Sequence, residues 1–449
     1  MGDSASEDAC QDEDCLDDHF LTVTDINMAD FLDEEEFNII GDNHQRTALE
    51  NLMRRTISVL LTIAFASTTA MGCIVEAEDD DDSEPEDHQA QNNDDLSGEW
   101  TLYTHPCVGH RTDALHCDDA ASCFVGCGTT ASGDQGFYVT DDGGATWESP
   151  TTDQAPMGES ARVNDISRSS DGLLYLGGKF AEPTRVLSLS ESGELTSVWE
   201  RGDTIDFNFD VGAFRRAENG RAVAVSQTGV GLVYRDGDDD EWDTGYGFWD
   251  DGDDDDVGSF GVQITSLASF DDGIYGAGST ISQPPMVFLP KWSDERFDFH
   301  IVQLAAEGSE AFNGELWGID VDDEFIVAGG VDQDSNTGVV FTHQFGDGDA
   351  TDPSNWTKFD VGSLFDGHTT WIQGVCLGDD GIYVVGRESM LEWGFVLRST
   401  DGGINFEDIS PYDEGSAQSN LADAYRCQST DDAVIVAGAE GLFAVYSDQ

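Results

Sequence analysis

The sequence predicts an all-β protein, a seven-bladed β-propeller of four-stranded antiparallel blades, on two observations. First, strand-like runs ending in small residues recur seven times at steps of 48–57 residues, from "CFVGCG" to "IVAGA". Second, each run follows a turn rich in Asp, Asn or Gly, and Asp-Gly and Asn-Gly are strong hairpin signals. A parallel α/β fold is excluded because no helical pattern of about 10–15 residues separates the strands.

Each repeat contains four strands in a constant order. An inner strand such as "QITSLA" precedes the turn, and the small-residue run follows it as the second strand. A third strand such as "MVFLP" comes next, and an outer strand bearing an aromatic residue closes most repeats. Such short, apolar-rich runs bounded by turn residues are typical of strands. The outer-strand aromatic residues are Trp147, Trp199, Trp242, Phe297, Trp356 and Phe406.

The two ends of the predicted propeller, residues 97–449, complement each other. The seventh repeat stops at "FAVYSDQ", where its outer strand is still missing. An extra strand, "GEWTLYTH", precedes the first repeat and carries Trp100 where other outer strands carry an aromatic residue. We expect this strand to pair beside residues 443–446 and close the ring, which leaves no free seam between first and last blades. The alternative is a plain linker.

Two turns resemble a known repeat. "TDDGGATW" and "STDGGINF" are similar to the Asp-box, or BNR repeat, of sialidase-like propellers, a superfamily that includes the photosystem II assembly factor. The resemblance implies a structural hairpin between third and fourth strands, in which Asp accepts hydrogen bonds, Gly supplies the positive φ and the aromatic residue packs beneath. Both turns fall at that place. The matching residues are Thr140, Asp142, Gly144, Trp147, Ser399, Asp401, Gly403 and Phe406.

Residues 53–73, "MRRTISVLLTIAFASTTAMGC", have the pattern of an export signal. Two arginines, a short apolar run and small residues define a secretory signal peptide over residues 53–72. The ending resembles the lipobox of bacterial lipoproteins, which implies lipidation of Cys73, although Ala70 stands where leucine is usual. The residue after the cysteine is Ile74, and this sequence resembles that of lipoproteins sorted to an outer membrane. Secretion without a lipid, to the periplasm or outside, and a buried core helix are the alternatives.

Acidic segments flank the export signal. Residues 1–52 hold 16 acidic residues and one Arg, which indicates either a mis-called start or a disordered acidic segment. Residues 73–96 hold 11 acidic residues and predict a solvated, disordered tether. The net charge of −73 excludes nucleic acid and anionic membrane surfaces as partners, so we expect membrane contact only through the lipid anchor, and a monomer.

Six cysteines follow the tether, and an even number in an exported chain predicts disulfides. Their pairing is open, because six cysteines allow about 15 connectivities. Three of them occupy equivalent places near the ends of innermost strands in blades six, seven and one, which are neighbours at the closure. The six are Cys107, Cys117, Cys123, Cys127, Cys376 and Cys427.

Basic residues on the innermost strands are the candidate ligand-binding residues. They lie in blades seven, one, two and three, and a basic patch at the channel inside an acidic shell suits a carboxylated or sulfated ligand. The alternative is that the arginines form ion pairs with acidic turns of neighbouring blades. The residues are Arg168, Arg215, Arg216, Arg426 and His116.

The expected cofactor is none, with calcium as the alternative at "DQDSNTG". Asp332, Asp334 and Asn336 resemble the start of a calcium loop, but the glycine comes one place late and no Glu closes it. Solvated loops are the competing interpretation.

No catalytic motif accompanies the predicted fold. Sialidases carry an "RIP"-like motif in the first blade, and neither it nor a phosphate loop, HExxH or GxSxG is present. The sequence therefore favours an exported, lipid-anchored binding or scaffold module of the cell envelope, with a protein or glycan at the cell surface as partner. The alternative is a glycoside hydrolase, sialidase-like enzyme or lectin that uses the mouth of the channel.

Overall fold

The computed structural model describes residues 98–447 except 109–110, 129–135, 150–156, 158–160, 201–209, 228–230, 239–240, 246–261, 281–283, 293–296, 305–312, 366, 389–392 and 413–418. All of them belong to the unit Gln91–Gln449. The predictions for residues 1–52, 53–72 and 73–96, including lipidation of Cys73, lie outside the described residues.

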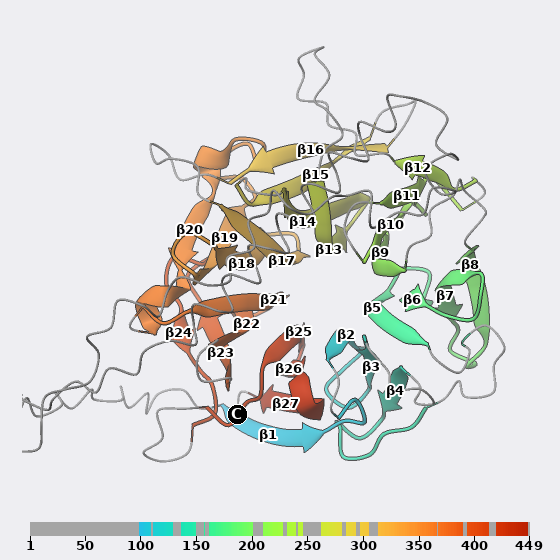
Figure 1. Ribbon diagram of the computed structural model, residues 1–449, viewed down its shortest axis with the longest axis horizontal. Helices are drawn as coiled ribbons and strands as arrows, with labels where there is room; N and C mark the ends of the chain where they lie inside the picture. Colours follow the sequence, from blue (N-terminus) through green and yellow to red (C-terminus); the bar gives the residue numbers. More distant parts are fainter. Residues whose placement is uncertain are drawn as a thin grey trace, which may run out of the picture. The chain divides into compact units, whose positions relative to one another are not determined.

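Seven antiparallel sheets stand around a common centre as the blades of a propeller, which confirms the predicted fold (Figure 1). The strands of each blade are given from the innermost outward. Blade one is β2(Thr112–Cys117), β3(Cys123–Cys127) and β4(Phe137–Thr140); blade two is β5(Arg162–Arg168), β6(Leu174–Lys179), β7(Thr184–Leu189) and β8(Leu195–Glu200); blade three is β9(Val211–Arg216), β10(Ala222–Ser226), β11(Leu232–Arg235) and β12(Asp243–Gly245); blade four is β13(Val262–Phe270), β14(Gly273–Thr280), β15(Met286–Trp292) and β16(Phe297–Gln303). Blade five is β17(Gly314–Val321), β18(Phe325–Asp332), β19(Thr337–Gln344) and β20(Thr357–Asp360); blade six is β21(Thr370–Gly378), β22(Gly381–Glu388), β23(Trp393–Ser399) and β24(Glu407–Asp408); blade seven is β25(Ala424–Thr430), β26(Ala433–Gly438), β27(Leu442–Ser447) and β1(Glu99–Thr104).

Blade one departs from the regular pattern because its sheet has three named strands. Its fourth position is a single bridge in which Val139 and Glu148 exchange backbone hydrogen bonds of 2.8 and 2.9 Å. The helical segments among the described residues are three short 3₁₀ turns, η3(Pro353–Asn355), η4(Val361–Leu364) and η5(Ala439–Gly441). None of the described residues forms a helix with the length and apolar character needed to cross a membrane.

The ring is closed by β1, which lies beside β27 as the outer strand of blade seven (Figure 1). Its register places Trp100 opposite Tyr446 and Tyr103 opposite Phe443, so the predicted closure is confirmed. The Trp100 indole donates a 2.7 Å hydrogen bond to the carbonyl of Ile409 in blade six. The closing strand therefore contacts two blades.

The hydrophobic core lies between neighbouring blades. The second strands are its most buried part; every residue of β10, "AVAVS", is buried. In blades four and five, for example, Val287 and Val302 share one cluster with Leu316, Ile319 and Val339. Burial of apolar surface contributes about 25 cal/mol per Å², so these interfaces hold adjacent blades together.

Three disulfides resolve the open pairing. Cys376–Cys427 joins the inner strands β21 and β25, and therefore blades six and seven. Cys107–Cys127 joins the segment after β1 to β3, across the ring closure. Cys117–Cys123 spans the hairpin between β2 and β3. Disulfides persist in oxidising compartments, so their presence indicates such an environment.

Candidate functional site

Every inner strand contains one β-bulge at the same level of the ring. In each pairing of an inner strand with its second strand, one inner residue is skipped and has no partner in the ladder. Bulges often re-aim side chains near binding sites. The seven bulged residues are Asp113, Asn164, Gly212, Thr265, Trp317, Gln373 and Tyr425.

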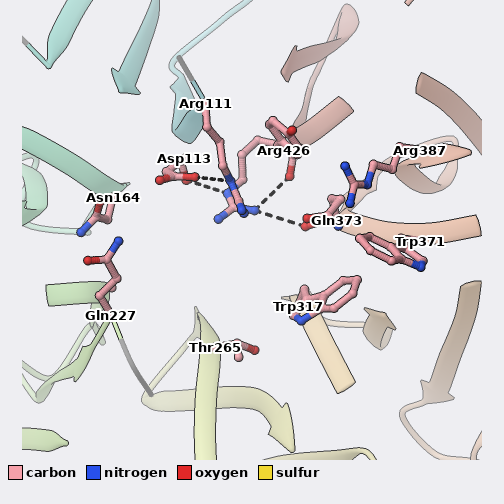
Figure 2. A pocket seen from close by; sticks show the side chains of 12 residues that line it. Arg111, Asp113, Asn164, Gln227, Thr265, Trp317, Trp371, Gln373, Arg387 and Arg426 are labelled. Atoms are coloured by element: carbon pink, nitrogen blue, oxygen red, sulfur yellow. Dashed lines mark hydrogen bonds and ion pairs between the residues drawn. The ribbon is translucent and has the colours of Figure 1, made fainter. Parts of the chain in front are cut away.

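All seven bulged residues line one cavity of about 420 Å³, which we call the mouth cavity (Figure 2). The volume lies within the range of small-molecule sites, about 300–1,000 Å³. Five further residues complete its wall: Arg111, Gln227, Trp371, Arg387 and Arg426. Each inner strand thus contributes its bulged residue to the shared cavity, and β21 and β25 contribute Trp371 and Arg426 as well.

One part of the wall is basic. Arg111 forms a 2.5 Å ion pair with Asp113, and Arg387 forms one of 3.0 Å with Asp423. Arg426 has no carboxylate partner among the described residues; it donates to the carbonyls of Asp113, Gln373 and Tyr425 at 2.7, 3.2 and 2.9 Å. The three arginines outnumber the two acids paired with them, so this wall keeps an excess positive charge.

Burial and repulsion act on Arg426 together. Its burial, and then the neighbouring charge of Arg111, lower the pKa of Arg426, while Asp113 and Asp165 raise it. Guanidinium groups remain charged in proteins at neutral pH, so the result is a half-buried, partly desolvated cation rather than a neutral side chain. Such a cation is stabilised by an anion that reaches it.

Aromatic rings border the basic wall. The Arg387 guanidinium lies 4.1 Å from the centre of the Trp371 ring, and that of Arg111 lies 4.7 Å from the Tyr425 ring. Both distances are within the range of cation–π attraction. The Trp317 and Trp371 rings meet edge to face at 5.9 Å (Figure 2).

Amide side chains complete the opening. Asn164 is 4% exposed and its Nδ2 donates 2.7 Å to the carbonyl of Val211, while its Oδ1 is buried without a hydrogen-bond partner among the described residues. Figure 2 shows Asn164 and Gln227 on the opposite side of the opening from the two tryptophans. A buried acceptor left unpaired costs about 1–3 kcal/mol, which a ligand N–H or O–H would relieve.

Below the mouth, a second cavity of about 310 Å³ continues along the inner strands, and we call it the channel cavity. His116 and Arg168 line it, and both contact Asp118 of blade one. The Arg168 guanidinium binds both Asp118 oxygens at 2.5 Å. Hydrogen bonds from His116 and then Arg168 hold the pKa of Asp118 down at about 2.

The remaining predicted arginines are also ion-paired. Arg215 lines the channel cavity and pairs with Asp165 of the preceding blade. Arg216 lines neither cavity; it is 8% exposed and binds Asp238 at 2.6 Å and Asp171 at 3.3 Å. The structure therefore brings Arg168, Arg215 and His116 to the channel and only Arg426 of the predicted set to the mouth as well.

An acid not singled out from the sequence, Asp320, also lines the channel cavity. Burial raises its pKa to about 6, while the backbone N–H groups of Leu377 and Val321, both at 2.9 Å, stabilise the charged form. The bond from Leu377 ties blade five to blade six.

The two turns with Asp-box sequences have one hydrogen-bond pattern. Asp142 accepts from the Thr140 hydroxyl at 2.9 Å and from the backbone and hydroxyl of Thr146 at 2.8 and 2.7 Å. Asp401 accepts in the same way from Ser399 and Asn405. Gly144 and Gly403 occupy the equivalent positions with φ of 97° and 85°.

The aromatic residue of each turn packs against an aromatic side chain of a neighbouring blade. Trp147 meets Phe443 edge to face at 5.0 Å, and Phe406 lies 4.9 Å from Phe359.

The turn named as the alternative calcium site is held by its own hydrogen bonds. Asp332 accepts from the backbone of Asp334 at 3.0 Å and from Lys358 at 3.4 Å, and Asn336 has a φ of 56°. Asp334 accepts from the backbone and side chain of Asn313. Among the residues that the structure describes, no group of three His, Cys, Asp or Glu side chains is placed to hold a metal ion.

Sequence reasoning missed most of the mouth cavity. Asn164, Trp317, Trp371 and Gln373 are not basic, so a search for charge passed over them. Alignment of the seven inner strands by their hairpin turns places the bulged residues in one column, and that alignment is the signal that would have found them.

No protein-family profile matches this chain, and no curated protein sequence matches it. Solved structures do. A catalytically inactive virginiamycin B lyase from Staphylococcus aureus, with quinupristin, is 11% identical with a TM-score of 0.52, covering 78% of this chain and 99% of that one. YCF48 bound to D1 peptide is 13% identical with a TM-score of 0.51, covering 78% and 95%. A streptogramin B lyase is 11% identical with a TM-score of 0.51, covering 78% and 98%. The chain therefore shares the fold of these propellers.

Proposed function

We propose that this protein is an exported, lipid-anchored β-propeller of the cell envelope that acts as a non-catalytic binding module, with the mouth cavity as its ligand site. The observation that supports this most is the convergence of one bulged residue from each of the seven inner strands on a single cavity. A site built from every blade is rigid, because each contributing strand is held in its own sheet.

The small number of carboxylic acids among the described residues of the mouth cavity favours binding over hydrolysis. Glycosidases use two carboxyl groups about 5–9.5 Å apart across the bond that they cleave. Among the described residues of the mouth cavity, Asp113 is the one carboxylic acid, and Arg111 pairs with it at 2.5 Å. A lectin or glycan-active enzyme at the same mouth is the second candidate, which the two tryptophans favour.

Two finer assignments belong to the proposal. The turns at Asp142 and Asp401 are Asp-box repeats with a structural role, supported by their shared hydrogen bonds. Cys73 carries the lipid that anchors the chain, supported by the sequence of residues 53–73 and by the disulfides. The partner is a protein or glycan at the cell surface; YCF48, one of the similar structures, has a bound peptide.

The test measures retention of the full chain on a glycan array and, in a separate assay, on extracted envelope proteins. Calcium is present in both assays. The matched variants are Arg426→Gln in the mouth and Arg221→Gln, an ion-paired arginine that lines neither cavity. Retention that Arg426→Gln removes and Arg221→Gln preserves is the expected result. Retention that survives Arg426→Gln would place the site elsewhere, and released sugar would overturn a non-catalytic role.

Anchoring is tested apart from binding. Full-length chain expressed with a labelled fatty acid should take up the label, and Cys73→Ser should lose both label and membrane association. Label that persists in Cys73→Ser would contradict lipidation at this cysteine.

A further inference from the structure

The mouth cavity presents three kinds of contact in fixed places. One side is basic, with Arg426 lacking a carboxylate partner among the described residues. A second side is aromatic, with Trp317 and Trp371. The opposite side offers neutral hydrogen-bonding groups, among them Asn164 Oδ1, which the described residues leave without a hydrogen-bond partner (Figure 2).

We propose, on the basis of the binding function above, that the mouth cavity binds a sugar acid, a pyranose unit with a single carboxylate such as a hexuronate at the end of an oligosaccharide. Its carboxylate contacts Arg426 and Arg111, one face of its ring covers a tryptophan, and its hydroxyl groups reach the amides.

The charge of the wall selects a single negative charge. On the basic side of the mouth cavity, Arg111 and Arg387 are offset by Asp113 and Asp423, which leaves Arg426 as the one cation there without a carboxylate partner among the described residues. A carboxylate neutralises one guanidinium and fits its planar N–H groups. A phosphate monoester brings up to two negative charges and would leave one of them beside Asp113.

The position of Arg426 makes this charge effective. Its Nε and Nη1 bind backbone carbonyls, so the side chain is fixed, while Nη2 has no hydrogen-bond partner among the described residues. The nearby Arg111 lowers the pKa of Arg426, and the same repulsion is relieved when an anion arrives. A pre-positioned donor spends little conformational entropy on binding.

The rest of the wall fits a polyhydroxylated ring better than a peptide side chain. Asn164, Gln227, Gln373 and Thr265 supply amide and hydroxyl groups, and two of them are nearly buried, at 4% and 7% exposure for Asn164 and Gln373. Buried neutral groups of this kind discriminate for ligands that hydrogen-bond to them. Trp317 and Trp371 offer apolar surface for the C–H face of the ring.

The test measures binding of a trisaccharide with one terminal hexuronate and two neutral sugars to the full chain by calorimetry and tryptophan fluorescence. Its methyl ester is the matched ligand, because it keeps the rings and loses the charge. We expect the ester, Arg426→Gln and Trp317→Ala each to weaken binding by about tenfold or more, while Arg221→Gln stays within about twofold. Equal binding of acid and ester would overturn recognition of the carboxylate.

Three further ligands separate failure of this inference from failure of the proposed function. If a sulfated or phosphorylated sugar binds and the hexuronate-ended trisaccharide does not, the sugar acid is wrong and an anion site in the mouth stands. If an acidic peptide binds in an Arg426-dependent way and no saccharide does, the ligand class is wrong and the binding module stands. If Arg426→Gln and Trp317→Ala bind every ligand as the native chain does, both proposals fail.

Discussion

His105 lies at the ring closure with 1% of its surface exposed, and its hydrogen bonds fix its protonation. Its Nδ1 accepts from the backbone N–H of Cys107 at 3.1 Å. The Thr112 hydroxyl donates to the Gly438 carbonyl at 2.7 Å, so at 2.9 Å it must accept from His105 Nε2. The ring is therefore neutral with its proton on Nε2, and a second proton would break the bond to Cys107.

This environment predicts a loss of stability in acid. Burial lowers the pKa of His105 from 6.5 to about 4, so the unfolded chain takes up the proton first as pH falls. The stabilisation is complete above pH 6.5 and declines through the window down to about 4, by about 3 kcal/mol in all. Chemical unfolding of the native chain and His105→Asn across this window should show a difference that shrinks as pH falls; parallel curves would contradict the assignment.

The Asp142 turn offers a second test within one pair of neighbours. Asp142 accepts three hydrogen bonds, whereas Asp141 has none from its side chain among the described residues. We expect Asp142→Ala to lower the melting temperature by about 2 °C and Asp141→Ala to leave it unchanged, because only the first loses turn contacts. Calorimetry of both variants checks this, and equal melting temperatures would refute a structural role for the turn.

The arginines show where sequence reasoning stops at the residue scale. Arg168, Arg215 and Arg216 each bind a carboxylate of the preceding blade, 45 to 50 residues away in the chain. Arg426 lies on an equivalent inner strand, and among the described residues it donates to backbone carbonyls and to no carboxylate. Whether an arginine forms an ion pair depends on its rotamer and on the contacts between blades. The repeat pattern of the sequence holds no information on either.

At the scale of elements, the pairing of β1 with β27 was predictable because a missing outer strand at one end matches an extra strand at the other. The bulges were not, since a bulge changes the pairing of a strand without changing its hydrophobic pattern. The same limit applies to the disulfides: spacing placed Cys376 and Cys427 on neighbouring inner strands and left the pairs open. Local sequence signals therefore predict the order of the strands. The residues that line the mouth cavity depend on the strand register at the bulges, which those signals do not determine.

The closing strand provides a matched pair of substitutions. Trp100 packs against Tyr446 at 5.1 Å and binds the Ile409 carbonyl, while Leu102 on the same strand is 43% exposed. Trp100→Ala should cost about 2 kcal/mol, below the range for fully buried Trp, and Leu102→Ala well under 1 kcal/mol. Hydrogen exchange should accelerate in β27 for Trp100→Ala only. Equal protection of β27 in both variants would show that β1 does not hold the seam.

At the scale of the whole molecule, charge dominates. Residues 97–449 carry 65 acidic and 16 basic side chains, so the propeller repels itself and repels anions at long range. The mouth cavity reverses this sign locally through Arg426. The anionic ligand that we propose would therefore be repelled at long range and attracted once it reaches Arg426. Salt would weaken the long-range repulsion more than the partly buried contact, which is screened less.

This charge distribution predicts that salt stabilises the fold. Added salt shortens the Debye length from about 30 Å at 0.01 M ionic strength to about 3 Å at 1 M, and this screening removes most of the repulsion between surface carboxylates. The melting temperature should therefore rise by several degrees from low to high NaCl, against the usual weakening of surface ion pairs by salt. Calcium chloride at equal ionic strength is the control for the loop at Asp332. An equal rise in both salts assigns the effect to screening, and an additional rise with calcium, removed by Asp334→Asn, assigns a bound ion. A melting temperature that falls with NaCl would show that the ion pairs between blades, such as Arg168–Asp118, outweigh the repulsion.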